Sequence, residues 1–206
     1  MNIPNALTIF RIFLVPVLVV IILTRFDERE ILGVTVFLLA ALTDWLDGFL
    51  ARRWQQITVF GKLIDPIADK ILIAAAFISL IQTGTAPAWM VVIIVGREFA
   101  LDGLRLVAQT QGVTIEASRL GKYKTASQIV CIVLLILGGK TPHIATLIGR
   151  ALSIPDPEVW LVPFFADAGK IMLWIVMTFA LFSGIDYFRH FYRRIDLGAA
   201  SAGTSA

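Results

Sequence analysis

The sequence predicts an all-α membrane protein with six transmembrane helices around a polar cavity that faces the cytoplasm. Three observations lead to this fold. The 206-residue chain is 58% hydrophobic, whereas soluble domains are usually about 45–50% apolar. Its mean hydropathy is +0.83. Its apolar residues gather in six stretches, most of them near the roughly 20 residues that cross a bilayer as a helix.

The six expected spans follow one another with short connections. They are Leu7–Leu23, Ile31–Leu50, Leu63–Ile81, Trp89–Ala108, Thr125–Leu137 and Val159–Phe182. The fifth is short, and we expect its helix to begin further back, near Leu120. No connection can hold a second domain, so we expect one membrane domain over residues 1–197. The tail 198–206 is small and polar, which predicts disorder.

Charged residues interrupt the spans in a regular way. Arg11 lies early in the first span and should face protein or extend to the interface. The acids of the second span come near its end, and those of the third span come near its beginning. Arg97 and Glu98 lie near the middle of the fourth span, where charged groups line a wet cavity or pair with each other.

The connections predict the orientation. Alternate connections and the segment after the last span carry ten basic residues, against four on the other side. Basic residues concentrate on the cytoplasmic side, so both termini and the acids should face the cytoplasm. The net charge of +3 therefore reflects the excess of basic residues on the cytoplasmic side. This basic side would also attract anionic lipid head groups. Basic residues spread over three membrane-edge segments do not indicate nucleic-acid binding.

Four aspartates between residues 44 and 69 are the main chemical signal. Asp44 and Asp47 are three residues apart, and Asp65 and Asp69 are four apart. Each spacing places two carboxylates on one helix face. Buried acids need a positive partner, and divalent cations such as Mg²⁺ take carboxylate oxygens. The alternative is a set of surface carboxylates at helix ends.

Small and basic residues beside these acids suggest a phosphate ligand. Gly48 and Ala51 share a helix face with Asp44 and leave room for a ligand to approach the backbone. Arg52 follows, and its planar fork suits phosphate oxygens; the alternative is an anchor at the interface. Carboxylates, metals and an arginine together suggest diphosphate chemistry, in which metals neutralise the phosphates and a carboxylate takes a proton.

The string from Asp44 to Asp69 resembles the signature of the CDP-alcohol phosphatidyltransferase family. That signature reads D-x-x-D-G-x-x-A-R, eight residues, then G-x-x-x-D-x-x-x-D. The chain matches it at every fixed position: Asp44, Asp47, Gly48, Ala51, Arg52, Gly61, Asp65 and Asp69. The resemblance implies a six-helix membrane fold, a cytoplasmic site and a homodimer.

The resemblance also implies roles for individual residues. Asp44 and Asp65 would bridge two Mg²⁺ or Mn²⁺ ions, and Asp47 would complete the site of the first ion. Asp69 would bind the second ion and act as the general base. The CDP moiety of CDP-diacylglycerol would be held by Gly48, Arg52 and Thr58, with Ala51 beside them.

Three further stretches resemble the branch of this family that makes phosphatidylglycerophosphate. They are N-I-P-N-A-L-T-I-F-R at the start, G-R-E-F-A-L-D-G-L-R in the fourth span and L-G-K-Y-K-T before the fifth. In the first stretch, Asn5 and Thr8 would close the nucleotide site.

Four basic residues from the later stretches form a candidate patch for an acceptor that carries its own phosphate. They are Arg97, Arg105, Lys122 and Lys124. Such a patch favours glycerol 3-phosphate over serine or inositol. The alternative for the two lysines is simple anchoring on the cytoplasmic side.

Together with the predicted topology, the resemblance thus implies an enzyme of the inner (cytoplasmic) membrane that transfers a phosphatidyl group from CDP-diacylglycerol to glycerol 3-phosphate and releases CMP. A phosphatidylinositol-phosphate synthase of the same family is one alternative. A divalent-cation transporter is another, but transporters place their acids near the midplane, whereas these acids lie towards one end of their spans.

Overall fold

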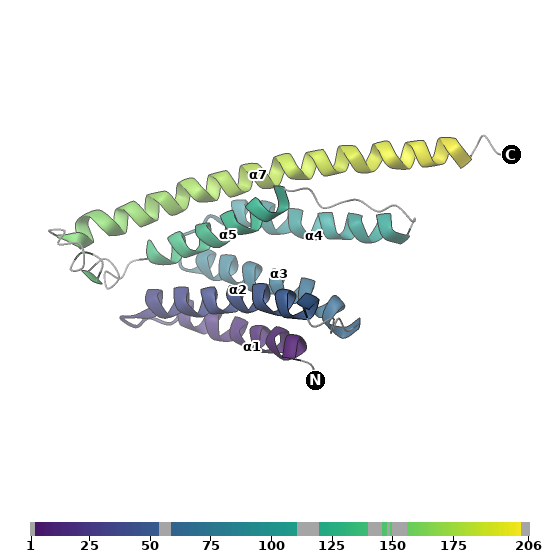
Figure 1. Cartoon of the computed structure of the whole chain (residues 1–206). Helices are drawn as coiled ribbons and strands as arrows, with labels where there is room; N and C mark the ends of the chain where they lie inside the picture. The colour runs from purple at the N-terminus through teal and green to yellow at the C-terminus, as the bar shows by residue number, and fades with distance from the viewer. Residues whose placement is uncertain are drawn as a thin grey trace.

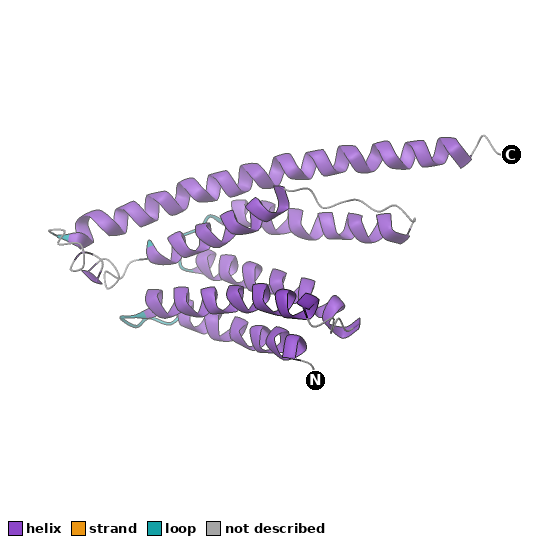
Figure 2. Cartoon of the chain, in the orientation of Figure 1, coloured by secondary structure: helices purple, strands orange, loops and turns teal. Residues whose placement is uncertain are grey.

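The computed structural model describes residues 3–53, 59–110, 120–139, 146–147, 149 and 156–202 (Figure 1). Six long helices account for most of them: α1 (Ile3–Leu23), α2 (Arg29–Arg53), α3 (Val59–Gln82), α4 (Ala88–Thr110), α5 (Leu120–Leu137) and α7 (Pro157–Ala202). Helices joined by loops make up this part of the chain, which contains no β-strand (Figure 2). The prediction of an all-α fold is therefore confirmed for the described residues.

Each expected span lies within one of these helices. Within the described residues, three stretches are long and apolar enough on their own to cross a membrane: Asn5–Leu23, Arg29–Phe49 and Val159–Arg189. A shorter apolar helix runs from Lys124 to Leu137. α3 and α4 are less uniform, because α3 carries acids in its first half and α4 carries charged residues from Arg97 onwards.

The helices form two groups joined at the centre. α1 packs on α2 and α3, while α7 packs on α4 and α5; further contacts of α3 with α4 and α5, and of α2 with α5, join the groups. The two chain ends lie at the same end of the bundle (Figure 1). The end of α2 and the start of α3 also lie there, and so the acids of both helices come together at what we call the aspartate end.

Every long helix contributes to one apolar core. Fully or almost fully buried side chains include Leu18, Phe37, Phe77, Ile94, Ile132 and Val176. The outer surface is apolar as well, with large exposed side chains such as Phe13, Val92, Trp160 and Phe182. An apolar surface of this extent is unfavourable in water and suits contact with lipid.

Glycine allows α5 and α7 to approach closely. A Cβ atom on Gly138 would lie 2.6 Å from the Cα of Ala166, and one on Gly169 would lie 2.9 Å from the Cδ2 of Leu135. Small residues at such contacts are typical of packed membrane helices. They hold α7 against the core along the half that is far from the aspartate end.

The last helix continues beyond the expected end of the domain. The sequence predicts disorder from Gly198, but α7 is helical to Ala202. Three of the five residues 198–202 are alanine, the residue with the highest helix propensity, so an existing helix extends into them at little cost. Residues 203–206 lie outside the described part of the chain.

Candidate active site

Two side chains of α1 gather three of the four aspartates. The Thr8 hydroxyl donates a hydrogen bond to Oδ1 of Asp65 at 2.6 Å and lies 3.4 Å from Oδ2 of Asp47. Arg11 pairs with Asp44 at 2.6 Å through Nη1 and with Asp47 through Nη2. α1 therefore joins the acids of α2 to the first acid of α3.

Arg11 is fully buried, with 0% of its side chain exposed. It faces protein, which is one of the two placements that the sequence allows. Its planar guanidinium fits the two carboxylates of α2 with separate nitrogens, an arrangement that the point charge of a lysine does not reproduce. Asp47 is almost as buried, whereas the side chain of Asp44 is 40% exposed. Solvent therefore reaches the site at Asp44 and is largely excluded from it at Asp47.

Asp69 lies one helical turn beyond Asp65 and lines a small pocket between α3, α4 and α5. Lys70, Glu98, Thr125 and Gln128 line the same pocket. Asp69 shares a face of α3 with Asp65, four residues earlier. It therefore links the carboxylates around Arg11 to the polar groups of α4 and α5.

Glu98 organises the polar groups on the far side of this pocket. Its Oε1 pairs with Lys124, lies 3.2 Å from Nη1 of Arg97 and accepts a 3.3 Å hydrogen bond from Gln128. Arg97 also donates to the hydroxyl of Ser183 on α7. Two of the four residues that were predicted to bind the phosphate of the acceptor substrate, Arg97 and Lys124, thus contact the same carboxylate.

Arg105 belongs to a second charged group one turn further along α4. Asp102 pairs there with Lys70 and lies 3.8 Å from Nη1 of Arg105. The guanidinium of Arg105 lies over the ring of Tyr187, 5.7 Å from its centre. The side chain of Arg105 therefore extends towards α7. Of the two basic residues in this group, Lys70 is the one that lines the pocket together with Asp69.

The remaining predicted residues differ in how far the structure describes them. Asn5 and Gly48 lie at the aspartate end of α1 and α2, each partly exposed. Ala51 and Arg52 fall in the last turn of α2, and Lys122 falls in the first turn of α5. The side chains of these last three lie outside the described residues, as does Thr58 altogether.

The site contains ligands of the type that divalent cations take. Two helices bring four carboxylates to one end of the bundle, and oxygen ligands of this kind suit Mg²⁺ and Mn²⁺. Among the described residues, Arg11 forms ion pairs with two of these carboxylates, Asp44 and Asp47. Within the described residues, no group of three or more acids, histidines or cysteines is arranged to hold one ion. Arg11 and Thr8 contact oxygens of Asp44, Asp47 and Asp65.

Sequence reasoning missed three residues of the site. Arg11 is absent from the predicted site, although a charge inside an apolar span is itself a signal of function. Lys70 follows Asp69 directly and gives the same signal in the third span. Gln128 is one polar residue among several early in α5, and no sequence pattern distinguishes it.

Comparisons with known proteins bear on this site. The family model described as CDP-alcohol phosphatidyltransferase matches residues 1–182. A protein of Bacillus subtilis (strain 168) named CDP-diacylglycerol–glycerol-3-phosphate 3-phosphatidyltransferase is 39% identical over 199 residues, covering 91% of this chain and 93% of the relative. Proteins with the same name from Rickettsia typhi and Salmonella choleraesuis (strain SC-B67) are 34% and 38% identical. They cover 91% and 86% of this chain, and 96% and 92% of their own lengths.

Proposed function

The chain belongs to the CDP-alcohol phosphatidyltransferase family, and we propose that it transfers the phosphatidyl group of CDP-diacylglycerol to glycerol 3-phosphate and releases CMP. One structural observation carries the proposal most directly. Asp44, Asp47 and Asp65 converge on Thr8 and Arg11, next to a pocket that places Asp69 beside Lys70 and Glu98. The relatives named for this reaction supply the choice of substrates.

The four aspartates would hold two Mg²⁺ or Mn²⁺ ions. When bound, these ions supply positive charge to the diphosphate and polarise its phosphoryl oxygens. The chain itself supplies the remaining functions. Arg11 fixes the orientation of Asp44 and Asp47, Thr8 fixes Asp65, and Gly48, Ala51, Arg52 and Thr58 are the proposed residues around the CDP moiety.

Asp69 is the proposed general base. It lines a pocket of about 30 Å³ that also contains Glu98, Thr125 and Gln128, so a hydroxyl group that enters this pocket lies beside its carboxylate. Lys124 and Arg97 then provide positive charge for the phosphate of the acceptor. The deprotonated hydroxyl forms a bond to the β-phosphorus of CDP-diacylglycerol, and the bond from that phosphorus to the oxygen of CMP breaks.

The proposal includes a placement in the membrane. All six long helices cross the bilayer, both termini and the aspartate end face the cytoplasm, and the protein is a homodimer in the inner membrane. The one-sided distribution of basic residues supports the orientation, and the shared end of the two termini supports an even number of crossings (Figure 1).

An acceptor assay tests the proposal. We expect purified protein with Mg²⁺ and CDP-diacylglycerol to release CMP with glycerol 3-phosphate and far more slowly with free glycerol, serine or inositol phosphate. The Asp65→Asn variant serves as the inactive control, because it loses one carboxylate of the cluster. Faster CMP release with inositol phosphate than with glycerol 3-phosphate would reassign the acceptor. CMP release at the same rate in Asp65→Asn would remove the aspartates from the reaction.

Replacing Lys124 tests the acceptor pocket. We expect Lys124→Ala to raise the KM for glycerol 3-phosphate by roughly ten- to hundredfold, since a hydrogen bond to a charged group contributes about 1.5–3 kcal/mol. The KM for CDP-diacylglycerol should change little. Arg105→Ala is the matched comparison and should have a smaller effect, because Arg105 contacts Tyr187. An unchanged KM for glycerol 3-phosphate in both Lys124→Ala and Arg97→Ala would place the phosphate elsewhere.

A further inference from the structure

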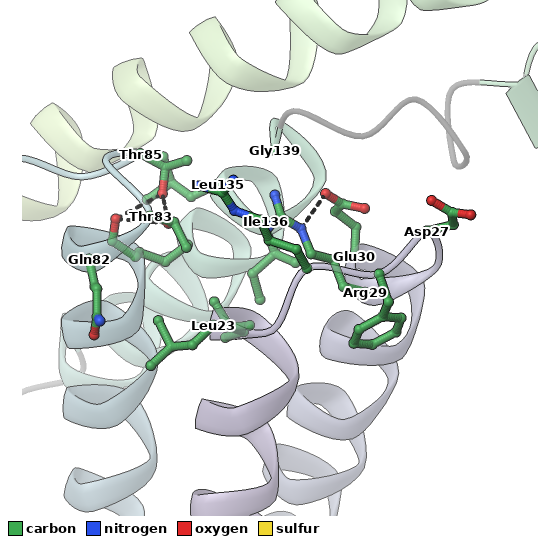
Figure 3. Close-up of a pocket in the computed structure, with 14 residues that line it drawn as sticks. Leu23, Asp27, Arg29, Glu30, Gln82, Thr83, Thr85, Leu135, Ile136 and Gly139 are labelled. Atoms are coloured by element: carbon green, nitrogen blue, oxygen red, sulfur yellow. Dashed lines mark hydrogen bonds and ion pairs between the residues drawn. The ribbon is translucent and has the colours of Figure 1, made fainter.

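A second cavity lies at the opposite end of the bundle from the aspartates. It has a volume of about 620 Å³ and is lined by the end of α1, the start of α2, the end of α3 and the end of α5 (Figure 3). Glu30 in this cavity and Asp44 are fourteen positions apart along α2, which corresponds to about 21 Å at 1.5 Å per residue. The cavity is therefore separate from the proposed active site.

Glu30 is the most unusual group in this cavity. It is only 3% exposed, and its Oε1 accepts a 3.1 Å hydrogen bond from Nε of Arg29. Its Oε2 is buried and has no hydrogen-bond partner in the part of the chain that the structure describes. A buried polar atom without a partner costs about 1–3 kcal/mol, and more in a charged group, so this oxygen requires a donor.

Gly139 lies directly against the carboxylate of Glu30. A Cβ atom on Gly139 would lie 2.7 Å from Oε1 of Glu30 and 3.0 Å from the carbonyl oxygen of Ile136. A side chain at position 139 would therefore require the carboxylate of Glu30 to shift.

The opposite wall presents further acceptors. The hydroxyls of Thr83 and Thr85 lie 3.1 Å and 3.0 Å from the carbonyl oxygen of Leu80, to which both can donate. The two hydroxyl oxygens also lie 3.1 Å from each other, so one can donate to the other, and the remaining lone pairs are acceptors on the cavity wall (Figure 3). On the other wall, Oε2 of Glu30 favours a positively charged N–H donor, and a primary ammonium group is such a donor.

The rim and the remaining walls indicate what is attached to that ammonium. Arg25 lies on the exposed rim and suits a phosphate. Ile22, Leu23 and Leu135 give the cavity apolar walls at the ends of the predicted spans, where lipid head groups meet protein. We propose that this cavity binds the primary ammonium of a phosphoethanolamine group through Glu30, and that an amino phospholipid of the bilayer supplies it.

A lipid series tests the proposal on the unaltered protein. Thermal unfolding is measured in nanodiscs of phosphatidylcholine that also contain phosphatidylethanolamine or its N-methyl or N,N-dimethyl form, with identical acyl chains. We expect the midpoint to be highest with phosphatidylethanolamine and to fall at each methylation, because each methyl group removes an N–H donor. Equal midpoints across the series would overturn the proposal. A second experiment adds soluble phosphoethanolamine to the protein in detergent. If the unfolding midpoint rises with this compound but not with phosphatidylethanolamine, the ligand is not a lipid of the bilayer.

Glu30→Gln assigns the effect to this cavity. A hydrogen bond to a charged group corresponds to a roughly tenfold or greater preference for phosphatidylethanolamine over its methylated forms. We expect Glu30→Gln to lose this preference. Native mass spectrometry of the bound lipid measures it. Glu28→Gln is the matched control, since Glu28 is exposed in the same connection and does not line the cavity. Turnover should persist in both variants, which separates this site from the proposed reaction. A preference retained in Glu30→Gln would contradict the assignment.

Discussion

Asp69→Asn is expected to lower turnover by about 10²–10⁴-fold, the usual loss when an acid–base group is removed. The amide keeps the size of the carboxylate but cannot take a proton from the acceptor hydroxyl. Binding of CDP-diacylglycerol in the presence of Mg²⁺ should change much less, because Asp44, Asp47 and Asp65 remain together on Arg11 and Thr8. Turnover is measured as CMP release, and binding is measured on the same preparations.

Two further variants make this result specific. Asp167→Asn is a harmless comparison, because Asp167 is exposed on α7 and pairs with Lys170 far from the site. Asp44→Asn should abolish turnover and also weaken metal and nucleotide binding, since Asp44 is a proposed bridging ligand. If Asp69→Asn weakens nucleotide binding as strongly as Asp44→Asn does, then Asp69 acts only as a metal ligand.

Arg11→Ala is expected to destabilise the protein by about 3–5 kcal/mol when metal is chelated, the range for breaking a buried ion pair. Most of the loss comes from Asp47, whose side chain is 4% exposed, while solvent at the 40% exposed Asp44 moderates its share. Mg²⁺ should recover part of the stability, because it supplies the positive charge that the variant lacks. Thermal unfolding in detergent with EDTA and then with Mg²⁺ measures both effects.

Arg11→Lys is the matched variant for this experiment. It keeps the charge but loses the planar fork that reaches two carboxylates at once, so we expect an intermediate loss of stability. The stabilisation by Mg²⁺ should be largest in Arg11→Ala and smallest in the parent. The same gain from Mg²⁺ in all three proteins would mean that Arg11 and the metal ions do not compensate the same carboxylates.

The sequence predicts the helices well because burial in a bilayer leaves a strong pattern. Each apolar stretch of near-membrane length corresponds to a helix, and the fixed spacing of Asp44, Asp47, Asp65 and Asp69 indicates which faces of α2 and α3 meet. Both signals are local. A stretch of apolar residues or a spacing of three or four on a helix is visible without any tertiary contact.

The partners across the bundle could not be predicted in the same way. Nothing in the sequence connects Arg11 with Asp44 and Asp47, or Lys70 with Asp102, because these pairs depend on how the helices rotate and pack against one another. The same holds for the acceptor patch. Its residues share a region of the sequence, yet Lys124 and Arg97 contact Glu98 whereas Arg105 contacts Tyr187.

The pairing of Arg11 with two acids on the next helix has a consequence for biogenesis. An arginine in the apolar segment of α1 is costly in a bilayer until an opposite charge reaches it, and its partners lie near the end of α2, which leaves the ribosome later. The first helix therefore gains its full stability in the membrane only after the second has arrived. In the membrane placement proposed above, this favours insertion of α1 and α2 as a hairpin, with the future site assembled in the same step.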